Sequence, residues 1–176
     1  PIHQGVIAIV EDIKEPSLEE LLDRINENKK DAFLIYIREA QNEANIGAII
    51  RSAEAAGCDA VLIPPKISLS PVMIRSSMGA SLHIPVINYN LFQSIKYLQK
   101  QNVKVVGIEM DGDKYYHEAD LRGPLMLIIG GEDRSLSQEL QDKCDMVVKI
   151  PMLGKVNSLN MSVAASIVMY EKVRQG

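Results

Sequence analysis

Apolar residues along this chain fall into two alternating patterns. In one, β-branched and other apolar residues follow one another for roughly four to eight positions, which indicates a strand. In the other, apolar residues recur at about every third or fourth position, which indicates an amphipathic helix. The runs at 103–110 and 124–130 are apolar at almost every position, as expected of strands buried on both faces. The predicted strands are 5–10, 32–37, 60–63, 85–89, 103–110, 124–130 and 146–150.

Local start and stop signals frame the predicted helices. Ser17 and Glu20 have the S-x-x-E spacing of a capping box, and Gly57 is typical of the residue that follows a helix. The predicted helices are 17–28, 46–56, a short one after 70–71, 91–101, 135–143 and 157–174. Because strands alternate with helices, we expect a single α/β domain over residues 1–176, with a mostly parallel sheet and helices on both faces.

The stretch KVNSLNMSVAAS at 155–166 reads as a turn followed by the start of the last helix. Taken alone, Asn157 or Ser158 is an N-cap. An N-cap does not explain a further polar residue, Asn160, on the first turn of an otherwise apolar helix. We expect the other face of this helix to be buried through Val163, Ile167 and Tyr170.

Composition places the chain among ordinary globular proteins. Of its 176 residues, 47% are hydrophobic and 24% are charged. No apolar run is long enough for a membrane span and no signal peptide opens the chain, so we expect a cytoplasmic protein. Cys58 and Cys144 are far apart and the histidines are scattered, so the sequence predicts reduced core thiols and no metal site.

Charge is distributed unevenly. The net charge is −4, but residues 11–23 hold six acids and one base, a net charge of −5, which leaves +1 for the remainder. A local basic face for nucleic acid therefore stays possible, and so does a plain scatter of solvated cations. The candidates for such a face are Arg51, Arg75, Arg134 and Lys155.

Three stretches at the expected carboxyl ends of the strands are rich in polar and glycine residues: 42–57, 129–137 and 150–160. Ligands bind at that edge in open α/β sheets. Considered one at a time, these residues are better explained by structural roles than by functional ones. Asn45 would be an N-cap, Arg51 a surface arginine, and Gly130-Gly131 a simple turn. The chain has neither the glycine pattern of a dinucleotide-binding turn nor that of a P-loop.

Together, the three stretches resemble the motifs of the SpoU-type RNA 2′-O-ribose methyltransferases of the SPOUT superfamily. The matching segments are NIGAIIRSAEAAG at 45–57, IGGE at 129–132 and IPMLGKVNSLNMSVA at 150–164. They occur in the family's order and the resemblance covers nearly the whole chain, with the bacterial 23S rRNA (guanosine-2′-O-)-methyltransferases nearest. HQGV at 3–6 resembles the entry to the catalytic domain in members with an N-terminal RNA-binding domain of the ribosomal-protein L30e/L7Ae type. We therefore expect the chain to be a fragment that lacks such a domain.

The resemblance implies S-adenosylmethionine as methyl donor, RNA as substrate, a homodimer with its sites at the interface, and the SPOUT fold with a C-terminal trefoil knot. The implied donor-binding positions are Gly107, Ile108, Glu109, Met110, Gly130, Ile150, Met152 and Leu159. The implied catalytic side chains are Asn45, Arg51, Glu132, Ser158 and Asn160.

The chemistry of the implied reaction assigns a role to Arg51. A ribose hydroxyl becomes a good nucleophile only as its proton leaves, so the enzyme must align the reactants and stabilise the developing alkoxide. Arginine stays protonated in proteins, so we expect Arg51 to stabilise the alkoxide and hold the adjacent phosphate rather than act as a base. The other four side chains would orient Arg51 and the ribose.

Two departures from the family pattern concern the substrate more than the reaction. Asn42-Glu43 replaces a frequent Asp-Pro, and Asp133 and Ser135 replace frequent glycines after the motif-two glutamate. We expect rRNA as substrate. The alternatives are a tRNA ribose methyltransferase, a non-catalytic RNA-binding module of the same fold, and a flavodoxin-like nucleotide-binding regulator. Aromatic residues are few, so recognition of single strands by base stacking is not the expected device.

Overall fold

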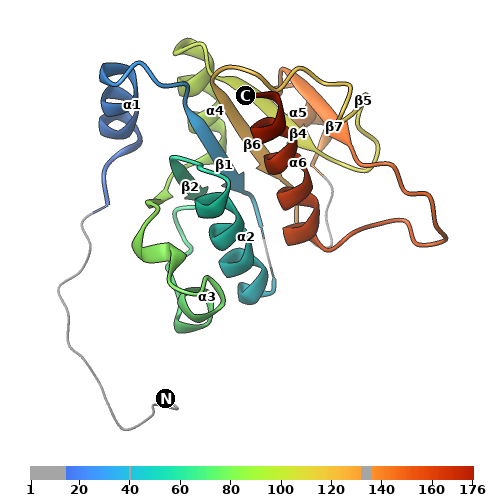
Figure 1. Ribbon diagram of the computed structural model, residues 1–176, viewed down its shortest axis with the longest axis horizontal. Coiled ribbons are helices and arrows are strands. Elements are labelled where there is room, and N and C mark those ends of the chain that lie inside the picture. The colour runs from blue at the N-terminus through green and yellow to red at the C-terminus, as the bar shows by residue number, and fades with distance from the viewer. Residues whose placement is uncertain (1–14, 40, 132–135) are drawn as a thin grey trace, which may run out of the picture.

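The structure is a computed structural model that describes residues 15–39, 41–131 and 136–176. One seven-stranded sheet runs through it in the order β3-β2-β1-β6-β4-β7-β5, and every pairing between these strands is parallel (Figure 1). The α/β fold with a mostly parallel sheet is therefore confirmed. The strands are β1 Phe33–Ile37, β2 Ala60–Ile63, β3 Val86–Asn88, β4 Lys104–Ile108, β5 Lys114–Tyr115, β6 Leu125–Ile129 and β7 Met146–Lys149.

Helices cover both faces of the sheet because side chains alternate across each strand. In β1, Ile35 and Ile37 join one apolar core with α2 (Glu43–Ala55) and α6 (Met161–Gln175). Leu34 and Tyr36 join the opposite core with α1 (Leu18–Glu27), α4 (Leu91–Lys100) and α5 (Gln138–Gln141). In Figure 1, α2 and α6 lie side by side in front of the sheet.

The predicted strands match the observed ones closely within the described residues. Continuous apolar runs became β4 and β6, which are buried along almost their whole length. The strand predicted at 5–10 lies outside the described residues. The short edge strand β5 was not predicted, because it has only two residues, both exposed, and contains no apolar run.

Helix starts follow the capping residues. The capping box of Ser17 and Glu20 is formed at the start of α1. Helix α2 begins three residues earlier than predicted, because Asn42 caps it by accepting a hydrogen bond from the Ala44 N–H at 2.9 Å. Asn45 therefore lies inside the first turn of α2, and its reading as the N-cap is wrong. Ser70 caps α3 (Pro71–Ser76), which is followed by the 3-10 helix η1 (Ala80–Leu82).

The last helix begins later and packs on a different face than the sequence predicts. Helix α6 starts at Met161, and its buried apolar residues are Met161, Ala165, Val168 and Met169. The expectation that Val163, Ile167 and Tyr170 bury this helix is wrong. Val163 is 47% exposed and Tyr170 is 50% exposed, while Ile167 is partly exposed. Met161, Ala165, Val168 and Met169 form the face of α6 that packs into the core, whereas Val163 and Tyr170 lie on its outward face.

Two close contacts fix α2 among its neighbours. A Cβ atom on Gly47 would lie 1.9 Å from Ser76 Oγ and 2.4 Å from the Met73 carbonyl oxygen, so only glycine allows α3 to pack this closely. On the side of α6, the hydroxyl groups of Ser166 and Ser52 share a hydrogen bond with an Oγ–Oγ distance of 2.8 Å. No helix in the described part of the chain is long and apolar enough to cross a membrane.

Candidate active site

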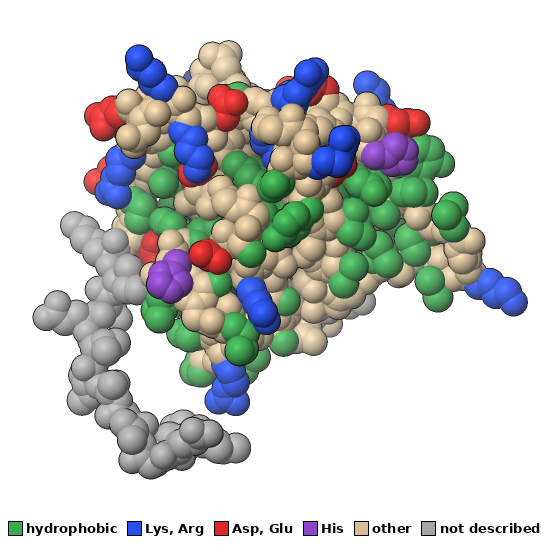
Figure 2. Space-filling model, in the orientation of Figure 1, with side chains coloured by type: hydrophobic (Ala, Val, Ile, Leu, Met, Phe, Trp, Pro, Cys, Tyr) green, Lys and Arg blue, Asp and Glu red, His purple; other side chains and the backbone are tan. Residues whose placement is uncertain are grey.

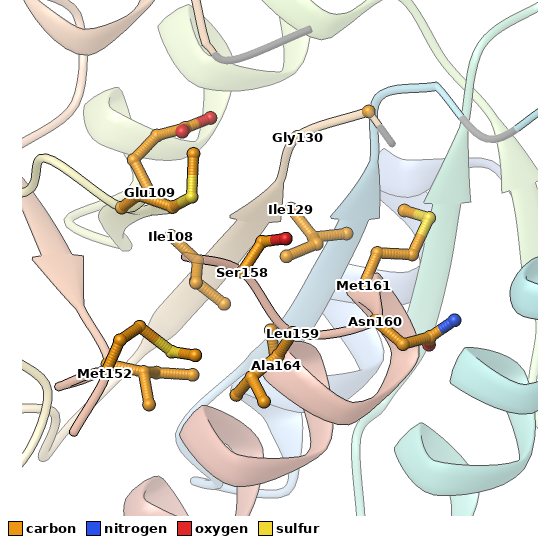
Figure 3. Close-up of a pocket in the computed structure, with 13 residues that line it drawn as sticks. Ile108, Glu109, Ile129, Gly130, Met152, Ser158, Leu159, Asn160, Met161 and Ala164 are labelled. Carbon is orange, nitrogen blue, oxygen red and sulfur yellow. The ribbon is translucent and has the colours of Figure 1, made fainter. Parts of the chain in front are cut away.

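A cavity of about 440 Å³ opens where β4, β6 and β7 end and α6 begins (Figure 3). Its position is the one expected for ligands of parallel α/β sheets, because the strand ends and helix starts leave backbone groups without ladder partners. The cavity is lined by Ile108, Glu109, Met110, Ile129, Gly130, Gly131, Ile150, Met152, Ser158, Leu159, Asn160, Met161 and Ala164.

Local sequence explains the character of this lining. The apolar runs of β4 and β6 supply Ile108 and Ile129 at their last positions, and Gly130-Gly131 then presents bare backbone. A Cβ atom on Gly131 would lie 3.3 Å from Glu39 Cβ, so a side chain there would crowd the neighbouring segment. The lining therefore combines apolar side chains with exposed peptide groups, which suits a ligand that is part apolar and part polar.

Seven of the eight predicted donor-binding residues line this cavity. They are Ile108, Glu109, Met110, Gly130, Ile150, Met152 and Leu159. Gly107 does not, because a side chain there would point at Leu136 and Cys144 on the other face of β4. Burial raises the pKa of the Cys144 thiol to about 11, so this group is protonated at neutral pH.

Sequence reasoning missed four lining residues: Ile129, Gly131, Met161 and Ala164. Ile129 and Gly131 flank Gly130, so their neighbourhood was a usable signal. Met161 and Ala164 belong to the first turn of α6, and their apolar side chains gave no sign of a binding role.

Asn160 connects the cavity to α2. Its Oδ1 accepts hydrogen bonds from the Ser162 N–H at 2.9 Å and from Ser162 Oγ at 2.6 Å, so Asn160 is the N-cap of α6. Its Nδ2 donates to Asn45 Oδ1 at 3.1 Å. The reading of Asn157 or Ser158 as the N-cap is therefore wrong. The structure brings Asn45, Ser158 and Asn160 to one edge of the cavity.

Arg51 lies elsewhere on α2. It follows Asn45 by six residues, which turns its side chain about 120° around the helix and moves it about 9 Å along the axis. Ser52, which bonds Ser166 of α6, shares the face of Asn45, whereas Arg51 is exposed and is not among the cavity's lining residues. The single chain thus does not bring Arg51 to its own cavity. Glu132, together with Asp133 and Ser135, lies outside the described residues.

The described lining contains one ionisable side chain. Glu109 follows β4, and its carboxylate accepts a hydrogen bond from the Leu136 N–H. Three thioethers, from Met110, Met152 and Met161, provide adaptable apolar surface. Within the described ranges, no group of three or more His, Cys, Asp or Glu residues is arranged to hold a metal ion.

Comparison with known proteins identifies similar sequences. The sequence model of the SpoU rRNA Methylase family matches residues 32–170. The chain is 38% identical to the 23S rRNA (guanosine-2′-O-)-methyltransferase RlmB of Xylella fastidiosa, over 98% of this chain and 71% of that protein. It is 34% identical to the putative TrmH family tRNA/rRNA methyltransferase YacO of Bacillus subtilis, with the same coverage of both chains.

Comparison with solved structures also finds SpoU methyltransferases. The crystal structure of the SpoU methyltransferase AviRb from Streptomyces viridochromogenes, in complex with the cofactor AdoMet, superimposes with a TM-score of 0.78. The two sequences are 31% identical, and the match covers 88% of this chain but 64% of that one. The chain therefore spans somewhat less than two thirds of the AviRb chain.

Proposed function

Because the chain belongs to the SpoU rRNA methylase family, we propose that it transfers a methyl group from S-adenosylmethionine to a ribose 2′-hydroxyl of RNA, with rRNA as the substrate class. The observation that carries this proposal is the cavity at the strand ends, with Ser158 and the hydrogen-bonded pair Asn45–Asn160 at one edge. It combines room for a donor with polar groups that can face an acceptor.

The residues of the cavity fit this donor. Its volume of about 440 Å³ lies in the range of small-ligand sites. Backbone groups at Gly130, Ile150 and Leu159 would hold the polar edges of an adenosyl group, and the side chains of Ile108 and Met152 would contact its apolar faces. When bound, S-adenosylmethionine supplies a methyl group that is already activated by a positively charged sulfur.

The chain's own polar residues would then position the acceptor. Asn160 is held at both ends, by Ser162 and by Asn45, so its orientation is fixed before RNA binds. Ser158 belongs to the same edge and can bond a ribose oxygen. Such fixed groups lower the barrier chiefly by alignment, and a cation is still needed for the developing alkoxide.

That cation is Arg51, and it comes from a second copy of the chain. On α6, the outward face carries Val163, Ile167 and Tyr170, and hydrophobic side chains gather over α6 and the region beside it in Figure 2. Exposed apolar surface of this kind marks an interaction site. The outward face of α2 carries Arg51 beside small residues such as Ala48. A homodimer through α6 and α2 covers the apolar face and lets each Arg51 reach the partner's cavity.

Several expectations stay predictions. The trefoil knot is one of them, and another is the L30e/L7Ae-type domain, whose prediction rests on residues 3–6, outside the described residues. A cytoplasmic location, the absence of a bound metal and the choice of rRNA over tRNA are likewise predictions.

The first experiment is calorimetric titration of the protein with S-adenosylhomocysteine, because it needs no knowledge of the RNA. We expect about one site per chain, with the variant Ala164→Phe, which fills part of the cavity, abolishing binding. Transfer is then measured with radiolabelled donor on unmethylated rRNA and tRNA, and 2′-O-methylation is identified by resistance of the labelled linkage to alkali.

Three results would contradict the proposal in different ways. Donor binding without transfer to any RNA supports the non-catalytic module. Transfer to tRNA alone moves the substrate class from rRNA to tRNA. Tight binding of a flavin nucleotide with no binding of S-adenosylhomocysteine supports the nucleotide-binding regulator.

A further inference from the structure

Helices α2 and α3 pack against each other in a definite register. Ser70, the N-cap of α3, donates a hydrogen bond to Glu43 Oε2 at 2.7 Å, at the first residue of α2. One turn further along α2, Gly47 faces Met73 and Ser76. The two helices therefore run in the same direction along this contact, and successive turns of α2 meet successive turns of α3.

Arg51 and Arg75 extend from neighbouring positions beside this contact. Arg51 follows Gly47 by about one turn, which places it about 6 Å further along α2 and turns it by only about 40° from the face that meets α3. Arg75 immediately precedes Ser76, the residue that Gly47 meets. Both arginines are exposed, and Figure 2 shows Lys and Arg side chains over the part of the surface that α2 and α3 form. The fold thus brings together two cations that β2 separates in the sequence.

Neither Arg51 nor Arg75 has a side-chain partner among the described residues. Elsewhere the chain does pair an exposed arginine with an acid, because Arg174 lies 2.6 Å from Glu171. Arg51 makes no such pair although Glu54 follows it by only three residues on the same helix. Each of the two guanidinium groups can therefore donate two parallel hydrogen bonds to a phosphate from outside the chain.

The proposed methyl transfer supplies a ligand of that chemistry. Arg51 is expected to hold the phosphate beside the reacting ribose, so the RNA strand continues past Arg51. Building on the proposed function, we propose that Arg75 is a substrate-positioning residue that holds a further phosphate of the same RNA strand. Such a contact fixes where the strand lies without reading its bases. Because both arginines belong to one chain, the proposal holds whether Arg51 serves its own cavity or that of a partner.

The test separates binding of RNA from the transfer step. Methyl transfer to unmethylated rRNA and tRNA is measured over a range of RNA and salt concentrations, for the unaltered protein and for Arg75→Ala. We expect the variant to raise KM for the accepting RNA roughly tenfold and to retain most of kcat, because one charge-assisted phosphate contact is lost. The slope of log affinity for RNA against log salt concentration should fall in magnitude by about 0.7–0.9, which a merely structural role would not cause.

Two further variants separate charge from geometry and position. Arg75→Lys keeps the charge and loses the planar fork, so the salt slope should stay unchanged and KM should rise less than in Arg75→Ala. Arg24→Ala removes an equally exposed arginine from α1, on the opposite face of the sheet, and should change neither KM nor the salt slope. All three variants should match the unaltered protein in thermal melting and in binding of S-adenosylhomocysteine.

An unchanged KM and an unchanged salt slope in Arg75→Ala would overturn the proposal, and so would a loss confined to kcat. An equal effect of Arg24→Ala would also overturn it, because net charge rather than position would then explain the result. If the unaltered protein transfers methyl to neither rRNA nor tRNA, the proposed function itself has failed. That failure is distinct, because it is seen in the unaltered protein before any variant is compared.

Discussion

Mixing two inactive variants tests whether Arg51 serves the cavity of its own chain or that of a partner. The first variant, Arg51→Ala, keeps the cavity intact. The second, Ala164→Phe, keeps Arg51 and fills part of the cavity that Ala164 lines. Each homodimer lacks one essential part in both sites, so each variant alone should be inactive, with donor binding retained only by the first.

The expected magnitude follows from the geometry of α2. Asn45 and Arg51 project about 120° apart around a helix that is about 10 Å wide, so the guanidinium would have to cross the helix to reach its own cavity edge. If Arg51 acts on the partner's cavity, each mixed dimer has one complete site. Random reassociation makes half of the dimers mixed, which gives about a quarter of the unaltered transfer rate.

The assay is transfer of labelled methyl to RNA after joint denaturation and refolding of the two variants in equal amounts. Arg24→Ala, a surface arginine on α1, is the matched control and should keep full activity when tested alone. A mixture as inactive as its components, although mixed dimers are shown by mass spectrometry, would refute action on the partner's cavity. A protein that sediments as a monomer would refute the dimer itself.

Further predictions concern packing, assembly and pH. Gly47→Ala should lower the free energy of unfolding by about 1–3 kcal/mol in urea titrations, because the new Cβ meets Ser76 and backbone, whereas Gly154→Ala, with open space around it, should be near neutral. Tyr170→Glu should give a monomer in sedimentation, because it places a charge on the outward face of α6; an unchanged dimer would exclude that face. Burial raises the pKa of Tyr36 to about 12, so its stabilising contribution is complete below the ordinary tyrosine pKa of about 10 and is lost as pH rises toward 12. Alkaline melting curves should therefore fall over that range, and less steeply in Tyr36→Phe.

The sequence predicted those parts of the fold that depend on short-range patterns. Five apolar residues in a row identified β1, and two residues three apart identified the capping box of α1. Signals of this kind are contained in one element, so no knowledge of its neighbours is needed. The same is true of the apolar strand ends and glycines that line the cavity.

The parts of the fold and of the site that the sequence did not predict depend on what each element packs against. Nothing local distinguishes Val163 from Val168, yet Val163 faces outward and Val168 is buried in the core that α6 shares with the sheet. The role of Asn160 as N-cap depends on where the preceding loop turns into the helix. Arg51 and Asn45 belong to one motif in sequence, but the rotation and the rise of α2 together separate them in space.

The hydrogen bond between Asn45 and Asn160 joins residues that are 115 positions apart, so it has a consequence for the order of folding. During synthesis, α2 leaves the ribosome long before α6, and contacts of such sequence separation form late. The growing chain can assemble β1 and β2 around α2 early. The lining residues at 158–164 are synthesised among the last, so that side of the cavity forms only when the chain is nearly complete. A chain released before α6 is complete would lack this part of the cavity lining and would therefore be inactive, so methyl transfer would indicate that synthesis had reached the C-terminal helix.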